Sequence, residues 1–379
     1  PAEEQVDRPS LRTVLTKLAE AYHEQQEAVT TQSAQVANRL IALSDAGVVR
    51  GPLRAELVDE LAQPLLTYFD PVNGGFGRGA KFPATQAIEL ALRQYRRHGD
   101  QQYLVAATRT LDNMAAGGIR DQLSGAFHRY TLDPRWRMPH FEIVGALNGG
   151  IMVAYLHAYQ ATGDSRYRLV AERVVDYLNR TLVDREQGGF YSSQDADTGA
   201  GDDGGYYTWT AAEIRAALPP EEAAVVLRFY GVPDPAAGIK LGDPPPAGRS
   251  VLYTAQPIAE VARAVGMPED QVRAYITSGR AHLRVARESR RAPPVDRSLF
   301  ADRSGALAAA YLEASQVLGR SDWRDLALRA LDRRLALPRQ DGLLAHFYPA
   351  QGPAGPGMLD DQMAASAALL DAFAITGER

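Results

Sequence analysis

The sequence predicts an all-α fold built from pairs of antiparallel helices. Long segments rich in alanine and leucine repeat their apolar residues at helical spacing, and breaks that contain glycine separate them. The letters GGF occur at 74–76 and 188–190, and each of these turns closes a helical hairpin. Strand-like alternation is confined to the short run 206–210. A repeat of helical pairs closes naturally into an α/α toroid, a ring of hairpins around a central funnel.

The individual helices follow from periodicity and from their end signals. We expect helices at 10–44 (with a break near Thr30 and Thr31), 52–68, 84–98, 100–116, 140–162, 164–184, 268–290, 302–318, 321–337 and 359–375. Ser10 suits the N-cap of the first helix. Glycine at positions 99, 163 and 319 separates the two helices of three hairpins.

Three regions are expected along the chain. Residues 1–209 are interpreted as hairpins of the toroid, and residues 292–379 as returning hairpins of the same toroid. Between them, residues 210–291 form an excursion of short helices and loops on the rim, with Pro244, Pro245 and Pro246 in one loop. Outside this excursion, about nine long helices leave the last one unpaired, so we expect the ring to be incomplete.

Composition excludes several classes of protein. A chain of 379 residues with 45% hydrophobic residues can bury a sizeable core. We expect a soluble protein, because no apolar run reaches the length of a membrane span. A net charge of −5 gives no reason to expect nucleic acid as a partner, and the lack of cysteine excludes thiolate chemistry within this chain. The start, Pro-Ala-Glu-Glu, predicts a processed product or a piece of a longer chain.

The stretch 117–148, GGIRDQLSGAFHRYTLDPRWRMPHFEIVGALN, concentrates ionisable and aromatic side chains between two helices. Long connections tend to carry function, so we interpret 117–139 as a loop over the mouth of the funnel, with a helix from Phe141. His128 and His140 could act as general base and acid. A metal is not expected, because a spacing of twelve residues is no recognised ligand pattern. His140 could equally cap the helix.

Other polar residues extend this candidate site. Aromatic faces and arginine forks suit a polyhydroxy ligand, although Trp136 could equally wedge two loops together. Asp195 and Asp197 could form an acid pair or simply shape a turn. The catalytic candidates are His128, His140, Glu142, Asp197 and His346; the ligand-binding candidates are Asp121, Gln122, Arg129, Tyr130, Trp136, Asp195, Trp209 and Asp361. We expect no cofactor.

Four ordered segments resemble a known family. They are GGFGRGAKFP (74–83), the run 117–142, GGFYSSQDADTG (188–199) with YYTWT (206–210), and DGLLAHFYPAQGPAGPGMLDD (341–361). They are similar to the helical part of the thioredoxin-domain (DUF255, spermatogenesis-associated protein 20 or YyaL-like) family. The resemblance implies a thioredoxin-like domain followed by an α/α toroid similar to N-acylglucosamine 2-epimerases and six-hairpin glycosidases.

The sequence departs from that family pattern at polar positions. The family motif HFEKMLYDN reads HFEIVGALN at 140–148, so its lysine, tyrosine and aspartate become Ile143, Ala146 and Leu147. The family's ADWNGLM reads ADRSGAL at 301–307, and the acid of SSEDAD is Gln194. Several groups that could carry charge in a family pocket are therefore replaced.

Three hypotheses follow. We favour a degenerate toroid that acts as a non-catalytic binding or assembly subunit, with a protein partner that completes or covers the open ring. The alternative is a carbohydrate-active enzyme, an epimerase or isomerase or, less readily, a glycosidase, that binds a sugar-like molecule in the funnel. In the third, the chain is a fragment of a longer thioredoxin-domain protein.

Overall fold

A computed structural model describes Glu4, Pro52 and Arg54 together with residues 9–46, 56–199, 202, 204–234, 248–348 and 354–378. The predicted loop at Pro244–Pro246 lies outside these residues. The chain forms two compact units, Pro1–Leu57 and Val58–Arg379. No helix within the described ranges is long and apolar enough to cross a membrane.

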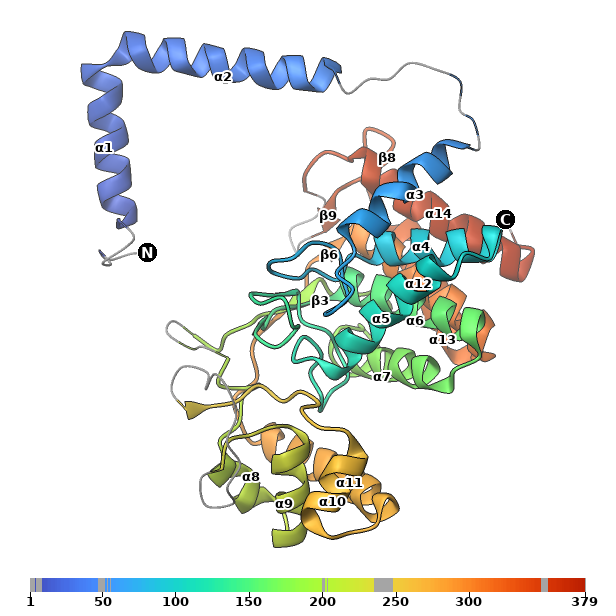
Figure 1. The fold of residues 1–379 in the computed structure, drawn as a ribbon. Helices are drawn as coiled ribbons and strands as arrows, with labels where there is room; N and C mark the ends of the chain where they lie inside the picture. The colour runs from blue at the N-terminus through green and yellow to red at the C-terminus, as the bar shows by residue number, and fades with distance from the viewer. Residues whose placement is uncertain are drawn as a thin grey trace. The chain divides into compact units, whose positions relative to one another are not determined.

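The first unit contains two helices, α1 (Leu11–Glu24) and α2 (Gln26–Ala46) (Figure 1). Ser10 caps α1 by accepting the Thr13 N–H at 3.2 Å, as predicted. The break lies at Gln25, so its prediction near Thr30 and Thr31 was wrong. Thr30 lies inside α2, where its hydroxyl donates to the Gln26 carbonyl at 2.7 Å. No residue of α1 is buried.

The second unit is an α/α toroid made of an inner and an outer layer. Its long helices are α3 (Glu56–Tyr68), α4 (Thr85–His98), α5 (Gln101–Ala116), α6 (Gly145–Thr162), α7 (Ser165–Thr181), α12 (Ala301–Leu318), α13 (Ser321–Ala336) and α14 (Leu359–Thr376). The pairs α4–α5, α6–α7 and α12–α13 are hairpins (Figure 1). The inner helices α4, α6, α12 and α14 pack side by side in that order. This confirms the predicted toroid, to which the described part contributes these four inner helices.

Glycine and aspartate produce the hairpins. Gly99, Gly163 and Gly319 end their helices in the left-handed conformation, which costs glycine little. Asp100 and Asp164 then cap the next helices by accepting N–H groups of the first turn at 2.9 Å. The sequence positions of these turns were therefore sufficient to predict the hairpins.

The excursion has a hydrophobic core of its own. It contains α8 (Ala211–Ala217), α9 (Pro220–Phe229), α10 (Ile258–Val265) and α11 (Glu269–Glu288). Val226, Leu227 and Leu283 are fully buried in that core. The strand expected at 206–210 is absent from this described stretch, where only Trp209 forms a bridge, with Ser250.

Short strands join the loops at the N-terminal ends of the inner helices. They are β1 (Tyr130–Thr131) with β2 (Pro139–His140), β3 (Ile143–Val144) with β4 (Ser193–Gln194) and β5 (Val295–Asp296), β6 (Leu299–Phe300) with β9 (Phe347–Tyr348), and β7 (Arg339–Gln340) with β8 (Leu343–Leu344). All pairs are antiparallel. The helix predicted from Phe141 therefore begins only at Gly145, because 139–144 pairs with two other segments.

Candidate functional site

The run 121–127 inside the organising stretch is the third copy of a structural turn. Its letters DQLSGAF match DPVNGGF at 70–76 and DREQGGF at 184–190, which share an aspartate, a glycine four residues later and a closing phenylalanine. In each copy the glycine N–H donates to the aspartate carbonyl, at 2.8–2.9 Å. The sequence analysis recognised only the two GGF copies. The spacing D-x-x-x-G-[GA]-F was the signal that would have found the third.

Each turn aspartate is paired with a cation from later in the chain. Asp70 binds Lys81, and Asp184 binds Arg333, each at 2.9 Å. Asp121 binds Arg287 of α11, also at 2.9 Å, and both side chains are buried. Burial opposes ionisation of Asp121, but the Arg287 charge outweighs it and lowers the pKa of Asp121 to about 2. Asp121 therefore has the same structural role in its turn as Asp70 and Asp184 have in theirs.

His128 lies in the core beside that ion pair. Only 1% of it is exposed, and its Nδ1–H donates to the Phe141 carbonyl at 2.9 Å. The rings of Phe141 and Tyr207 contact the imidazole edge to face. Burial lowers the pKa of His128 to about 4, so the ring is neutral at pH 7. The adjoining cavity measures about 10 Å³, room for at most about one water molecule.

Four predicted ligand-binding residues also occupy structural positions. Gln122 is buried and donates to the Ala115 and Gly117 carbonyls. Trp136 is fully buried, and its Nε1–H donates to the Asn73 carbonyl at 2.9 Å. The Arg290 guanidinium lies 3.9 Å from the centre of the buried Trp209 ring. Together with Asp121, these side chains join loops to one another rather than facing a cavity.

Arg129, Tyr130, His140 and Glu142 do come together, at the surface. Register in the β1–β2 pair places Tyr130 opposite His140, and their rings stack at 5.2 Å. Phe82 also stacks on the Tyr130 ring, with 4.9 Å between the ring centres. Arg129 donates to Glu142 at 2.9 Å. Glu142 lies between β2 and β3, not in the first turn of a helix as the sequence predicted.

The acids after the second GGF turn lie in the loop that follows β4. Asp195 is exposed and accepts the Ala196 N–H at 2.7 Å, a local contact that shapes the loop. Asp197 is partly buried in the same loop. Gln194 is buried, where it accepts from the Tyr177 hydroxyl at 2.8 Å and donates to the Pro293 carbonyl. An amide satisfies both contacts at once, which a carboxylate could not.

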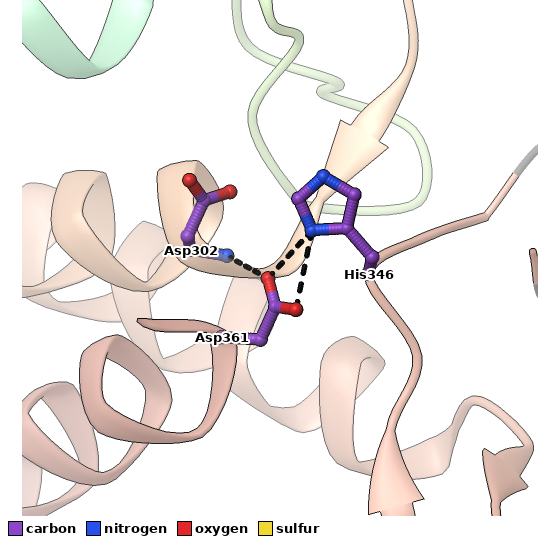
Figure 2. Close-up of side chains that lie close together, drawn as sticks. All are labelled: Asp302, His346 and Asp361. Carbon is purple, nitrogen blue, oxygen red and sulfur yellow. Dashed lines mark hydrogen bonds and ion pairs between the residues drawn. The ribbon is translucent and has the colours of Figure 1, made fainter. Parts of the chain in front are cut away.

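His346 and Asp361 meet at the start of α14 (Figure 2). His346 Nδ1 lies 3.0 Å and 3.1 Å from the two carboxylate oxygens of Asp361. That carboxylate also accepts the N–H groups of Asp302 and Met358, at 3.2 and 2.8 Å. Donor atoms of Asp302, His346 and Asp361 lie within 4.8 Å of one another, a geometry that could hold a metal ion. Asp361 is already satisfied by three donors, so helix capping accounts for its position.

A concave cavity of about 730 Å³ opens on the inner faces of α4, α6 and α12. Its lining is apolar at one end, with Ala146 and Leu147, and carries Glu89 and Glu313. His157 bridges the two glutamates, at 2.6 Å to Glu89 and in contact with Glu313. Hydrogen bonds from Glu313 and then Glu89 raise the pKa of His157 to about 9. His157 lies within a predicted helix and was not singled out from the sequence, although Ala-Tyr-Leu precedes both His157 and Glu313.

Comparison with known proteins identifies sequence relatives. Spermatogenesis-associated protein 20 from Homo sapiens is 30% identical over 343 residues, which cover 84% of this chain and 43% of the relative. The Mus musculus protein of the same name is 28% identical over 343 residues, with the same coverage. The chain thus spans less than half the length of the curated relatives it matches. No protein-family model matches.

Solved structures give weaker matches. A family 76 glycoside hydrolase from a bovine Bacteroides thetaiotaomicron strain is 10% identical, with a TM-score of 0.45; the match covers 79% of this chain and 44% of that one. Cellobiose 2-epimerase from Spirochaeta thermophila is 17% identical, with a TM-score of 0.33, over 84% of this chain and 97% of that one.

Proposed function

Because the chain belongs to the spermatogenesis-associated protein 20 family and its described inner helices form an arc that ends at α14, we propose that it is a non-catalytic assembly subunit. The proposed binding surface is the groove between α13 and α14. Its occupant is a helical hairpin of another polypeptide that continues the same repeat. One observation carries this proposal, the open apolar groove on the last inner helix of the described arc.

The groove is large and apolar. It forms a cavity of about 760 Å³ lined by Leu328, Leu331, Leu335, Leu369, Leu370, Ala372 and Phe373, with Asp332, Ser366, Thr376 and Glu378 among its polar residues. Leu370 is 68% exposed and Phe373 is 44% exposed. Leucines at 369 and 370 and phenylalanine at 373 recur at helical spacing, so they form one stripe along α14. Exposed apolar stripes of this size are typical of a surface that a second element covers.

The repeat itself favours a helical hairpin as that element. The inner helix α6 is packed between α4 and α12, and α12 between α6 and α14. In the described chain, α14 packs on α12, α13 and the short strand β8. A further hairpin would cover α14 in the way that α14 covers α12.

The placement of the candidate catalytic residues supports a non-catalytic reading. His128 is neutral, buried and next to a cavity of about 10 Å³, so a substrate cannot reach it in this arrangement. His346 is bound to the carboxylate that caps α14. General acid–base chemistry requires a group within hydrogen-bond reach of the substrate, and these two histidines have structural partners instead.

Site-specific photo-crosslinking tests the proposed groove. A benzoylphenylalanine at position 370 should crosslink to a leucine-rich helical segment of another polypeptide, whereas one at exposed Leu169 on α7 should not. The purified segment should then bind the wild-type chain one to one in calorimetry. Leu370→Glu should weaken that binding at least roughly tenfold, because a charge would be buried, and Leu169→Glu should leave it unchanged.

Two results would contradict the assembly role. Crosslinks from position 370 only to a second copy of this chain would assign the groove to self-association. Equal affinity of wild type and Leu370→Glu for the purified segment would show that the groove is not the binding surface. Thermal unfolding followed by circular dichroism checks that each variant is folded.

A second candidate function is sugar binding at the surface ladder of Phe82, Tyr130 and His140. These three stacked rings are partly exposed, with Phe82 at 57%, and the Arg129–Glu142 ion pair lies beside them. Aromatic faces and charged hydrogen-bonding groups are what polyhydroxy ligands require. Incubation with aldoses and ketoses in heavy water distinguishes the two candidates. Deuterium incorporation that Tyr130→Ala and His140→Gln abolish would favour an isomerase or epimerase over the assembly role.

A further inference from the structure

Five arginines gather where the turn 120–125 lies between α7 and α11. They are Arg120 in the turn, Arg173 and Arg180 on α7, and Arg280 and Arg284 on α11. Positions 173 and 180 are seven apart, and 280 and 284 four apart, so each pair shares one face of its helix. The described contacts bring both helices to this turn, and Arg287 of α11 binds Asp121 there at 2.9 Å. Arg180 donates to the Ser124 carbonyl, and the Arg173 side chain and carbonyl are the nearest atoms to a Cβ built on Gly125.

Their positive charges are not matched by acids. Within the described residues, none of these five guanidinium groups forms an ion pair with a carboxylate. Asp176, between the two α7 arginines, contributes one negative charge to the group. The nearby Asp121 is already bound to Arg287. The cluster therefore keeps an excess of positive charge.

Part of this charge is withdrawn from water without a partner. The Nε atoms of Arg120 and Arg284 are buried and make no hydrogen bond. Arg120 lies over the Phe127 ring, 6.0 Å from its centre, whereas Arg280 lies 5.8 Å from the centre of the Tyr230 ring and donates to the Tyr230 hydroxyl. Burial, and then the charges of Arg280 and Arg173, lower the pKa of Arg120 to about 10. Buried cationic donors without acceptors are costly, and a bound anion removes that cost.

We propose that the seam between α7, α11 and the turn 120–125 binds a small multivalent anion of the phosphate class. Guanidinium groups bind phosphate through two parallel hydrogen bonds each, and several of them can surround one phosphoryl group. All five arginines are at least partly exposed. The site is distinct from the groove on α14 and from the surface ladder at Tyr130.

Calorimetric titration with inorganic pyrophosphate and, separately, with glucose 1-phosphate tests the site. The two compounds distinguish a free inorganic anion from an organic phosphate as the ligand. Arg284→Gln and Arg173→Gln should each weaken binding roughly tenfold or more, because each removes charged hydrogen bonds. Arg284→Lys should recover only part of the affinity, because lysine keeps the charge but not the fork. Arg273→Gln on the same helix is the matched control, since Arg273 is exposed and paired with Glu269 at 2.7 Å. It should bind like the wild type.

The outcome separates the possible sources. Binding of both compounds assigns the site to the phosphoryl group, binding of pyrophosphate alone to a free inorganic anion, and binding of glucose 1-phosphate alone to an organic phosphate. Binding of neither compound would overturn the proposal. So would an equal loss of affinity in Arg273→Gln and Arg284→Gln, because long-range charge rather than this seam would then account for it. Thermal unfolding of each variant with and without pyrophosphate confirms that the fold is retained.

Discussion

At the scale of single residues, His157 shows how one side chain can join three helices. It lies on α6 and contacts Glu89 of α4 and Glu313 of α12, so the same imidazole bridges three neighbouring inner helices. Both ring nitrogens face carboxylates, which requires a protonated ring. The carboxylates in turn raise the pKa of His157 to about 9 from its usual 6.5. The bridge is therefore an ionic contact at neutral pH.

The stability that His157 contributes should depend on pH. Its pKa is higher in the folded state, so the contribution is complete below pH 6.5, decreases above it, and is lost as the pH rises through about 9. Allowing for the partial exposure of Glu313, it is worth roughly 2 kcal/mol. Urea unfolding at pH 6 should show wild type more stable than His157→Gln by that amount, and at pH 10 the difference should vanish. His282→Gln is the control, because His282 is half exposed beside Glu222.

A difference that persists unchanged at pH 10 would contradict the ionic interpretation of His157. It would mean that the side chain acts through packing alone. The control at His282 should change the free energy of unfolding less than His157→Gln does at pH 6, because its ring is half exposed and contacts one carboxylate rather than two.

Residue-level chemistry was only partly predictable from the sequence. His128 and His140 were expected to share one site, but His128 is buried whereas His140 is exposed and stacks on Tyr130. Side chains ten to twelve residues apart in a loop can face opposite sides, and only the pairing of β1 with β2 decides which. Trp136 is buried because a distant carbonyl, that of Asn73, accepts its N–H.

At the scale of elements, small residues set the distances between helices. Gly305 of α12 faces the backbone of α14, where an added Cβ would lie 2.7 Å from the Ala364 carbonyl carbon. Backbone cannot move aside as a flexible side chain can. The close approach of α12 and α14 therefore depends on this glycine, and α14 is the helix that carries the groove of the proposed assembly surface.

Gly305→Ala should loosen α14 from α12. We expect a loss of about 1–3 kcal/mol in the free energy of unfolding, together with faster hydrogen exchange in α14. Gly163→Ala is the control, because its positive φ of 73° costs about 1 kcal/mol while no neighbour lies within 4 Å. It should leave exchange in α14 unchanged. Wild-type exchange rates for α14 in Gly305→Ala would show that the helix pair tolerates a methyl group here.

Helix ends were predicted correctly where neighbouring residues determine them. They were predicted poorly where strand pairing with distant residues determines them. Gly99-Asp100 and Gly163-Asp164 end one helix and cap the next, so both hairpins were correctly placed. The start of α6 was misplaced because 139–140 pairs with 130–131 and 143–144 pairs with 193–194, some fifty positions away. Such contacts leave no periodic trace in the sequence.

At the scale of the whole molecule, the two compact units differ in how much they bury. α6 and α12 are buried on several faces, whereas no residue of α1 is buried, and its apolar stripe of Leu11, Leu15 and Leu18 is exposed. Amides open for exchange most easily where few apolar contacts must break. In the isolated chain, α1 and α2 should exchange within seconds, whereas α6 and α12 should stay protected until global unfolding. Mass spectrometry of the exchanged peptides measures this, and equal protection of α1 and α6 would contradict it.

The three turn ion pairs also have a consequence for biosynthesis. Asp70 pairs with a cation eleven residues later in the chain. The cation of Asp121 lies 166 residues later, and that of Asp184 lies 149 residues later. A ribosome adds about 5–20 residues per second, so the second and third acids remain without their cations for roughly ten to thirty seconds. The nascent chain can complete its first turn alone. The second and third turns lack their ion pairs until α11 and α13 have been translated. During that interval the nascent chain has to be protected from aggregation by other means.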